Sequence, residues 1–281
     1  MMSYKIVVDS CCELPEEYKK DSRFEIIPLE LTVGEWSVPD DETFDQALFL
    51  KKVAECPTCP RSSCPSPERF MQSYDCEAEH VYVVTLSTNL SGSYNSAVLG
   101  KNLYEEKQGI EKKILVIDSK SASCGETQIA LKAMELEEKG LPFEKIAQEL
   151  NAFRDELDTY FVLNNLETLR KNGRLSGVKA LVASTLNIKP VMGATEEGTI
   201  IQLGQAIGLK KALSRMASLV AEQTKVPQEK CLMISHCNNP EKAAWVRDMI
   251  LQKAPFARSL ILDTAGISSM YANDGGIIIA V

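Results

Sequence analysis

The chain has 281 residues, of which 44% are hydrophobic and 25% are charged, as is typical of soluble globular proteins. Its formal net charge of −8 argues against nucleic acid or an anionic membrane surface as the main partner, because both require a basic surface. No apolar run reaches the ~18–20 residues of a membrane span, and the first residues do not resemble a signal peptide. We therefore expect a cytoplasmic protein.

Apolar runs that are typical of β-strands alternate with amphipathic segments along nearly the whole chain. The predicted strands cover residues 4–10, 24–31, 80–86, 112–119, 159–165, 229–236, 258–264 and 275–281. The clearest predicted helices cover residues 43–55, 91–107, 125–139 and 240–253. Several of the strands are apolar on both faces, which is typical of parallel strands covered by helices. The sequence therefore predicts the α/β class.

The helix-rich stretch 122–157 ends near Asp158, where a new strand begins. We place a domain boundary there, which gives two α/β domains, 1–158 and 159–281, both with mostly parallel sheets. The proline-rich loop 54–66 is the least regular segment, and such loops often carry function. The N-terminal domain is therefore expected to hold the functional loops.

Several common catalytic and cofactor-binding motifs are absent from the sequence. It has no GxxxxGK[ST] phosphate loop, no GxGxxG after the first strand, no HExxH and no GxSxG. Cys56, Cys59 and Cys64 raise the alternative of a metal or redox site, but a structural zinc site needs four suitably spaced ligands. We favour free thiols at these positions, and we expect neither a metal nor a cofactor.

Two loops rich in hydroxyl groups each lead into a predicted helix. The first, LSTNLSGSYNSA, follows a buried strand and places Ser91, Gly92 and Ser93 at a helix start. The second contains Ser62 and Ser63. Free N–H groups at a helix start attract anions, and hydroxyls both donate and accept, so the two loops could bind one small anionic group. For either loop alone, a capped helix without a ligand is the simpler interpretation.

Five segments of the chain, in the same order, resemble the signatures of one bacterial family. KIVVDSCCELP at 5–15 resembles IVTDSTADLP, SSCPSP at 62–67 resembles TSQPSP, and LSTNLSGSYNSA at 86–97 resembles LSSxLSGTYxSA. VIDSKSASCGE at 116–126 is nearly a direct match, and residues 166–192 resemble LxxLxKGGRIS…LLxIKPI. Over essentially its whole length, the chain thus resembles the DegV family of fatty-acid-binding proteins.

The resemblance implies two α/β domains that hold one long-chain fatty acid, such as palmitate, between them. It implies that the carboxylate is bound by the hydroxyls of Ser62 and Ser91, with Ser63 nearby and with Gly92 and Ser93 offering backbone N–H groups. It also implies a carrier with no catalytic residues of its own. Such a carrier presents the fatty acid to a separate fatty-acid kinase subunit, which makes the acyl phosphate.

The chain departs from the family pattern near the expected head group. Ser62 replaces a threonine and keeps the hydroxyl, whereas Cys64 replaces a glutamine and loses an amide donor. Where the family has HxGPG near its C-terminus, this chain reads YANDG, so Tyr271 stands in place of the histidine. A tyrosine hydroxyl can hydrogen-bond a carboxylate, but it carries no charge that titrates near neutral pH. We expect Tyr271 to flank the head group.

Arg174 and His236 are two further candidates. Arg174 could pair with an acyl phosphate or an acidic kinase surface, and His236 matches a family position at a strand end. An exposed ion pair and a structural histidine are the respective alternatives. The rival function is a serine-dependent acyl hydrolase that uses Ser91 and His236, although the sequence marks no orienting acid. The apolar segment 180–192 is a candidate wall for the acyl tail.

Overall fold

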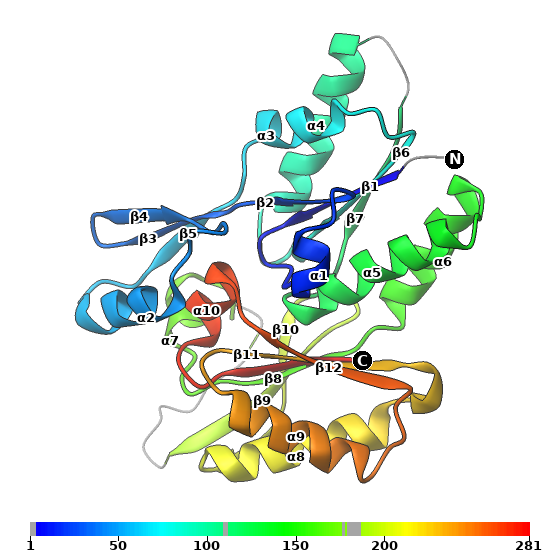
Figure 1. Cartoon of the computed structure of the whole chain (residues 1–281). Helices are drawn as coiled ribbons and strands as arrows, with labels where there is room; N and C mark the ends of the chain where they lie inside the picture. Colours follow the sequence, from blue (N-terminus) through cyan, green and yellow to red (C-terminus); the bar gives the residue numbers. More distant parts are fainter. Residues whose placement is uncertain (1–3, 109–111, 176–177, 179–186) are drawn as a thin grey trace.

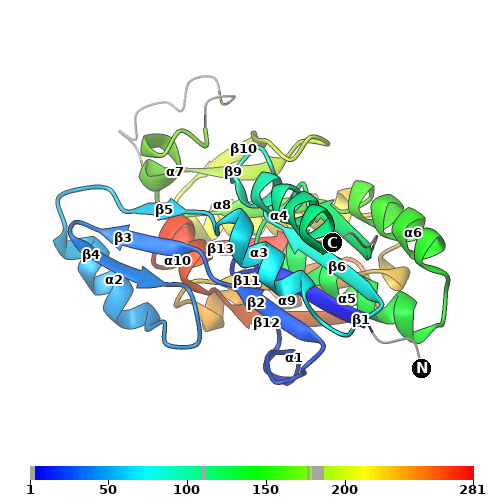
Figure 2. The same cartoon turned by 90° about the horizontal axis from the view of Figure 1, so that it is seen from above.

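The computed structural model describes residues 4–108, 112–175, 178 and 187–281, whose strands form a four-stranded, a six-stranded and a three-stranded sheet. The two larger sheets lie in separate layers with helices between them and on their outer faces (Figure 1). The three-stranded sheet projects to one side, together with helix α2 (Figure 2). The confirmed class is therefore α/β.

The four-stranded sheet is entirely parallel. Its strands, in the order β2-β1-β6-β7, are β2 (Phe24–Ile27), β1 (Tyr4–Asp9), β6 (His80–Thr85) and β7 (Lys113–Asp118). Val7 and Val81 pack on one face with the helices α3 (Pro67–Tyr74) and α4 (Ser93–Gln108). Ile6 and Val8 pack on the other face with α5 (Cys124–Glu138) and α6 (Phe143–Asp155). The short helix α1 (Glu16–Lys19) follows β1.

The six-stranded sheet is mixed, and only β11 and β12 pair in parallel. Its order is β10 (Ile200–Ile207), β9 (Ile188–Ala194), β8 (Thr159–Val162), β13 (Ile277–Ala280), β11 (Cys231–His236) and β12 (Arg258–Asp263). Helices α8 (Leu209–Gln223) and α9 (Pro240–Leu251) cover its outer face, with the 3-10 turn η1 (Pro227–Glu229) between them in sequence. Met233 and Ala280 share a core with α5, which thus packs between the two sheets.

The three-stranded sheet is antiparallel and links the two halves of the molecule. Its order is β4 (Trp36–Pro39), β3 (Glu30–Val33) and β5 (Arg61–Ser63). Its apolar side chains share a core with α2 (Gln46–Glu55) and with α10 (Gly266–Ala272), a helix that comes near the end of the chain. The short helix α7 (Glu167–Lys171) contacts α10. This arrangement brings early and late segments of the sequence to one place.

Two details of the predicted fold need correction. The strand predicted over 24–31 is two strands, since β2 ends at Ile27 just before Pro28, which has no N–H to donate, and β3 belongs to another sheet. The expectation of mostly parallel strands holds for the four-stranded sheet but not for the six-stranded one. There β13 inserts antiparallel between β8 and β11. Burial on both faces therefore did not determine strand direction.

The strands up to Asp118 belong to the four- and three-stranded sheets, whereas every described strand from Thr159 onward belongs to the six-stranded sheet. The predicted boundary after Asp158 falls between these two groups. We propose it as the boundary between two domains, 1–158 and 159–281.

Candidate functional site

A cavity lies between the carboxyl ends of the parallel strands and the inner face of the six-stranded sheet. Its hollow, including the part open to solvent, measures about 740 Å³. One side is formed by the loops after β1, β6 and β7, and the other by β8, β9, β10, β13 and α10. The apolar lining residues are Leu86, Leu90, Ala122, Phe161, Leu163, Leu169, Ala194, Ile200, Ile267, Ala272 and Ile278. Such a surface suits a long apolar ligand.

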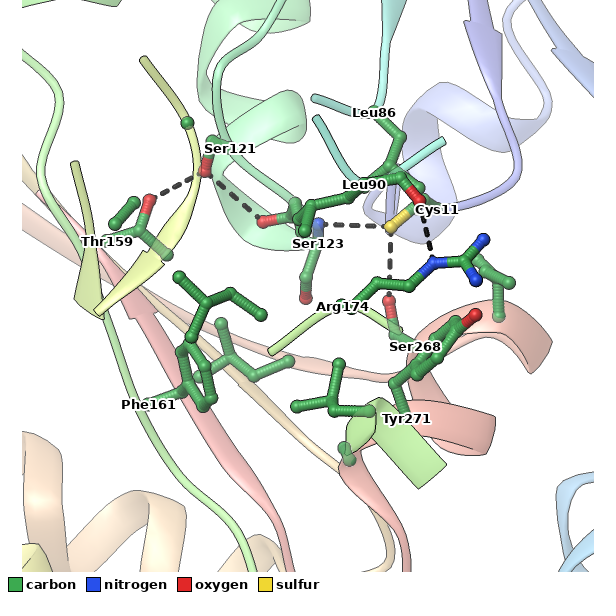
Figure 3. A pocket seen from close by; sticks show the side chains of 18 of the residues that line it. Cys11, Leu86, Leu90, Ser121, Ser123, Thr159, Phe161, Arg174, Ser268 and Tyr271 are labelled. Atoms are coloured by element: carbon green, nitrogen blue, oxygen red, sulfur yellow. Dashed lines mark hydrogen bonds between the residues drawn. The ribbon is translucent and has the colours of Figure 1, made fainter. Parts of the chain in front are cut away.

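Tyr271 and Arg174 also line this cavity, as Figure 3 shows. Tyr271 comes from α10, and its hydroxyl lies 3.4 Å from the hydroxyl of Ser62 on β5. Arg174 follows α7, and its Nε donates to the carbonyl of Leu90 at 3.1 Å. Its Nη1 also donates to the carbonyl of Asn172. Two predicted site residues thus line the cavity, and Ser62 is joined to one of them, Tyr271.

The two hydroxyl-rich loops lie side by side, as expected. A Cβ atom on Gly92 would come within 2.9 Å of Cys64 Sγ, so the first loop passes closely over the second. Ser91 Oγ lies 3.1 Å from Ser93 Oγ and accepts the N–H of Ser93 at 3.2 Å. This turn leads directly into α4. The structure therefore places Ser91 beside the loop that contains Ser62.

Of the predicted head-group residues, Tyr271 lines the cavity, whereas Ser62, Ser63, Ser91, Gly92 and Ser93 are not among its lining residues. Ser63 follows Ser62 on β5, and consecutive strand residues point to opposite faces, so the Ser63 side chain points away from Tyr271. The hydroxyl of Ser93 is buried beside Asp9. Of the predicted wall 180–192, residues 180–186 lie outside the described residues, and the part of β9 that lines the cavity is Gly193 and Ala194, just beyond it.

His236 ends β11 outside the group of residues that line the cavity. Its Nδ1 lies 3.3 Å from the N–H of Asn239 and 3.1 Å from Oδ1 of Asp263. Burial lowers the pKa of His236, so the ring is neutral near pH 7 and Nδ1 can accept the Asn239 N–H. In the described contacts, Ser91 is paired with Ser93 rather than with this histidine. The geometry therefore gives no support to a Ser91–His236 hydrolase.

A buried polar cluster behind the cavity wall was not assigned a role from the sequence. Cys11 Sγ accepts the N–H of Ser123 at 3.3 Å and lies 3.6 Å from Ser268 Oγ; all three residues line the cavity (Figure 3). Ser123 Oγ donates to Glu13 Oε2 at 2.5 Å, and Ser235 Oγ donates to the same oxygen at 3.2 Å. Burial raises the pKa of Glu13 to about 7.

Ser123 also has an unusual backbone. Its φ of 60° and ψ of −130° are strained for a residue with a side chain. The sequence did contain a signal for this polar cluster. It is the serine-rich turn that follows a strand in the segment 116–126, which also carried the family resemblance. Ser121, in the same loop as Ser123, forms a hydrogen bond between its Oγ and Thr159 Oγ1 on β8 at 2.6 Å, which joins the two sides of the cavity. The lining thus contains fixed hydroxyls, together with Lys120 and Arg174, within a largely apolar surface.

The cysteines of the loop 54–66 do not converge. Cys56 Sγ lies 3.2 Å from Thr58 Oγ1, Cys59 Sγ lies 3.5 Å from Asn172 Nδ2, and Cys64 Sγ lies 3.8 Å from Ser96 Oγ. Among the described residues, no group of three His, Cys, Asp or Glu side chains is placed to hold a metal ion.

Nor does the described part of the chain contain a helix long and apolar enough to cross a membrane.

Comparison with known proteins decides the family. A family model described as "Uncharacterised protein, DegV family" matches residues 3–280. The chain belongs to the DegV family. A DegV domain-containing protein of Streptococcus pyogenes serotype M1 is 36% identical over 280 residues, which cover 99% of this chain and 98% of the relative. The resemblance drawn from the five sequence segments is thereby confirmed.

Solved DegV structures share the fold over essentially the whole chain. A DegV protein from Ruminococcus gnavus, refined with vaccenic acid, is 52% identical with a TM-score of 0.97 and covers 100% of this chain and 99% of its own. The Streptococcus pneumoniae Fatty Acid Kinase (Fak) B3 protein loaded with linoleic acid is 30% identical, with a TM-score of 0.88 and 99% of each chain covered. A Eubacterium eligens DegV protein loaded with heptadecanoic acid is 27% identical, with a TM-score of 0.89 and 99% of each chain covered.

Proposed function

We propose that this protein is a non-enzymatic carrier that binds one long-chain fatty acid in the cavity. The acyl tail lies against the apolar walls, and the carboxylate meets the hydroxyls of Ser62, Tyr271 and Ser91. Because the Ser93 N–H donates to Ser91 Oγ, backbone donation to the ligand from this turn falls to Gly92. The observation that carries the proposal is a cavity with apolar walls that is lined by Tyr271, whose hydroxyl lies 3.4 Å from that of Ser62.

The energetics suit a lipid. Each buried methylene contributes about 0.8 kcal/mol, so a sixteen-carbon tail offers roughly 12 kcal/mol before the entropic costs of binding. The tail can therefore supply the affinity without a strongly charged pocket. Neutral hydroxyls fix the orientation of the carboxylate and leave it chemically accessible. This combination suits a carrier whose cargo must react elsewhere.

The bound acids of the relatives support the same ligand class, and the Fak B3 relative supports a kinase as the partner. In this proposal the carrier presents the carboxylate to a separate fatty-acid kinase, which forms the acyl phosphate. Arg174 stands at the cavity with a guanidinium that suits a developing phosphate or an acidic partner surface. His236, whose Nδ1 accepts the N–H of Asn239, has no part in it.

The first test is denaturing extraction of the purified protein followed by mass spectrometry. We expect one long-chain fatty acid per chain, as in the relatives refined or loaded with vaccenic, heptadecanoic and linoleic acids. A protein that carries no lipid, and whose melting temperature added palmitate does not raise, would contradict the proposal.

The second test concerns the head group. Replacing Ser62 and Ser91 together by alanine removes two hydroxyl partners of the carboxylate, and we expect palmitate to bind at least about tenfold more weakly, since each such hydrogen bond contributes about 1 kcal/mol or more. The matched control is Ser37→Ala, which removes an exposed serine hydroxyl on β4 of the same sheet. Equal affinity of the double variant and the control would remove these serines from the site.

A further inference from the structure

Helix α10 carries four of the residues that line the cavity, yet its N-terminus is held by a residue from the other end of the chain. Asp40, directly after β4, is 2% exposed. Its Oδ1 accepts the N–H of Gly266 at 2.6 Å, and its Oδ2 accepts the N–H of Ile267 at 2.8 Å. Backbone N–H groups in the first turn of a helix have no partner within it, so one carboxylate satisfies two of them.

A second side chain, close to Asp40 in sequence, hydrogen-bonds the side of α10. Gln46, the first residue of α2, donates from Nε2 to the carbonyl of Thr264 at 2.9 Å. The same nitrogen lies 3.1 Å from the hydroxyls of Thr264 and Ser269. The segment that enters α10 and the middle of the helix are thus both tied to the N-terminal part of the chain. Figure 1 shows α10 beside α2 and the three-stranded sheet.

The start of α10 lies so close to Asp40 and Leu31 that position 266 has no room for a side chain. A Cβ atom at Gly266 would lie 2.6 Å from Asp40 Oδ1 and 2.6 Å from Leu31 Cδ1. Leu31 on β3 is the register partner of Ser62 on β5. The sheet that holds the start of α10 is therefore also the sheet that presents Ser62 to Tyr271, the next-to-last residue of the same helix.

We infer that Asp40 is a positioning residue for fatty-acid binding: with Gln46, it clamps α10 onto the three-stranded sheet and so fixes the Ser62–Tyr271 pair at the carboxylate. This inference rests on the proposed function. Ser62 and Tyr271 lie on separate elements that are far apart in sequence, and their hydroxyls meet only if α10 keeps its position on the sheet. The clamp provides that position from the opposite end of the helix.

The substitution Asp40→Asn tests the clamp with the least change in volume. An amide offers one acceptor oxygen where the carboxylate offers two, so one of the N–H groups of Gly266 and Ile267 loses its partner. The full-length protein is stripped of lipid and loaded with cis-parinaric acid, a fluorescent fatty acid. Its dissociation is then followed after addition of excess palmitate. We expect dissociation to be at least tenfold faster in Asp40→Asn than in the wild type.

The matched control is Asp45→Asn, which changes the same atoms at another helix cap in the same region. Asp45 is exposed and accepts the N–H of Leu48 in α2 at 2.9 Å, away from α10. Its dissociation rate should stay within twofold of the wild type. If Asp40→Asn does not fold, Gln46→Met removes the flank contact while keeping the side-chain length, and a several-fold faster dissociation is expected.

A second mutant background distinguishes a positioning residue from a helix cap that serves stability alone. If Asp40 acts through the hydroxyl of Tyr271, Asp40→Asn should accelerate dissociation less than twofold in a Tyr271→Phe protein. Equal acceleration in both backgrounds would overturn the inference. So would a folded Asp40→Asn protein whose rate equals that of the wild type. Wild-type protein that does not bind cis-parinaric acid would overturn the proposed function, and the inference with it.

Discussion

The Glu13 side chain is buried between the N-terminal part of the chain and the six-stranded sheet. It accepts hydrogen bonds from Ser123, which lines the cavity, and from Ser235 on β11, and burial raises its pKa from 4.5 to about 7. Below pH 4.5 the group is protonated in both the folded and the unfolded chain. As the pH rises toward 7, the unfolded chain loses the proton while the folded chain retains it, so the free energy of unfolding falls.

The substitution Glu13→Gln should remove this dependence. Relative to the wild type, the free energy of unfolding of the variant should rise as the pH increases from 4.5 to 7, by about 3 kcal/mol at most, since one pKa unit corresponds to about 1.4 kcal/mol. Urea unfolding of both proteins at several pH values between 4 and 8 measures the difference, in which other groups cancel. A difference independent of pH would show that Glu13 ionises normally.

At the same scale, the head-group residues show what a sequence can predict. Ser62 and Ser91 were expected near one another because they occupy positions in family-like segments, and Tyr271 because it replaces a family histidine; the structure brings Ser62 and Tyr271 to 3.4 Å. Asp40 and Glu13 were not expected in the site. Asp40 follows β4, a strand that the sequence did not predict, and its partners lie more than 200 residues away. Local patterns contain no signal for such a contact.

At the scale of elements, α3 and α4 pack closely because Gly100 lacks a side chain. A Cβ atom there would lie 2.6 Å from the carbonyl oxygen of Pro67 and 3.0 Å from Cβ of Phe70. We expect Gly100→Ala to lower the free energy of unfolding by about 1–3 kcal/mol, because the overlap outweighs the gain of up to about 1 kcal/mol in helix propensity.

The control for this prediction is Asn102→Ala on the exposed side of the same helix, which gains propensity without a clash. The two substitutions should therefore change the free energy of unfolding in opposite directions, as measured by chemical unfolding. A stabilised Gly100→Ala protein would mean that the helices separate at little cost.

The same scale shows which elements the sequence could predict. Strands β1, β6, β7 and β11 were predicted because they are continuous apolar runs. Strands β9 and β10 were missed, since Pro190 interrupts one pattern and the register shift near Gly204 interrupts the other. Strand β5, with the sequence RSS, has no apolar pattern at all and is defined by its pairing with β3. These elements depend on tertiary contacts.

At the scale of the whole molecule, the cavity takes one wall from each half. Leu86 and Ala122 follow strands of the four-stranded sheet, whereas Phe161 and Ile278 belong to the six-stranded sheet. The direction of the strands in that second sheet could not be read from apolar periodicity, because antiparallel and parallel strands are equally apolar when helices cover both faces. A ligand in this cavity contacts both halves at once.

Fatty acid should therefore stabilise the two halves together. At a free palmitate concentration about a hundredfold above the dissociation constant, binding adds about 2.7 kcal/mol to the free energy of unfolding, which corresponds to a rise of roughly 5 °C in a chain of this size. Differential scanning calorimetry of lipid-free protein, with and without palmitate, measures the rise, and hexanoate, whose short tail leaves most of the apolar wall uncovered, is the control. Because the ligand joins both walls, the whole transition should move. Two separate transitions, of which palmitate moves only one, would mean that the ligand is held by one half alone.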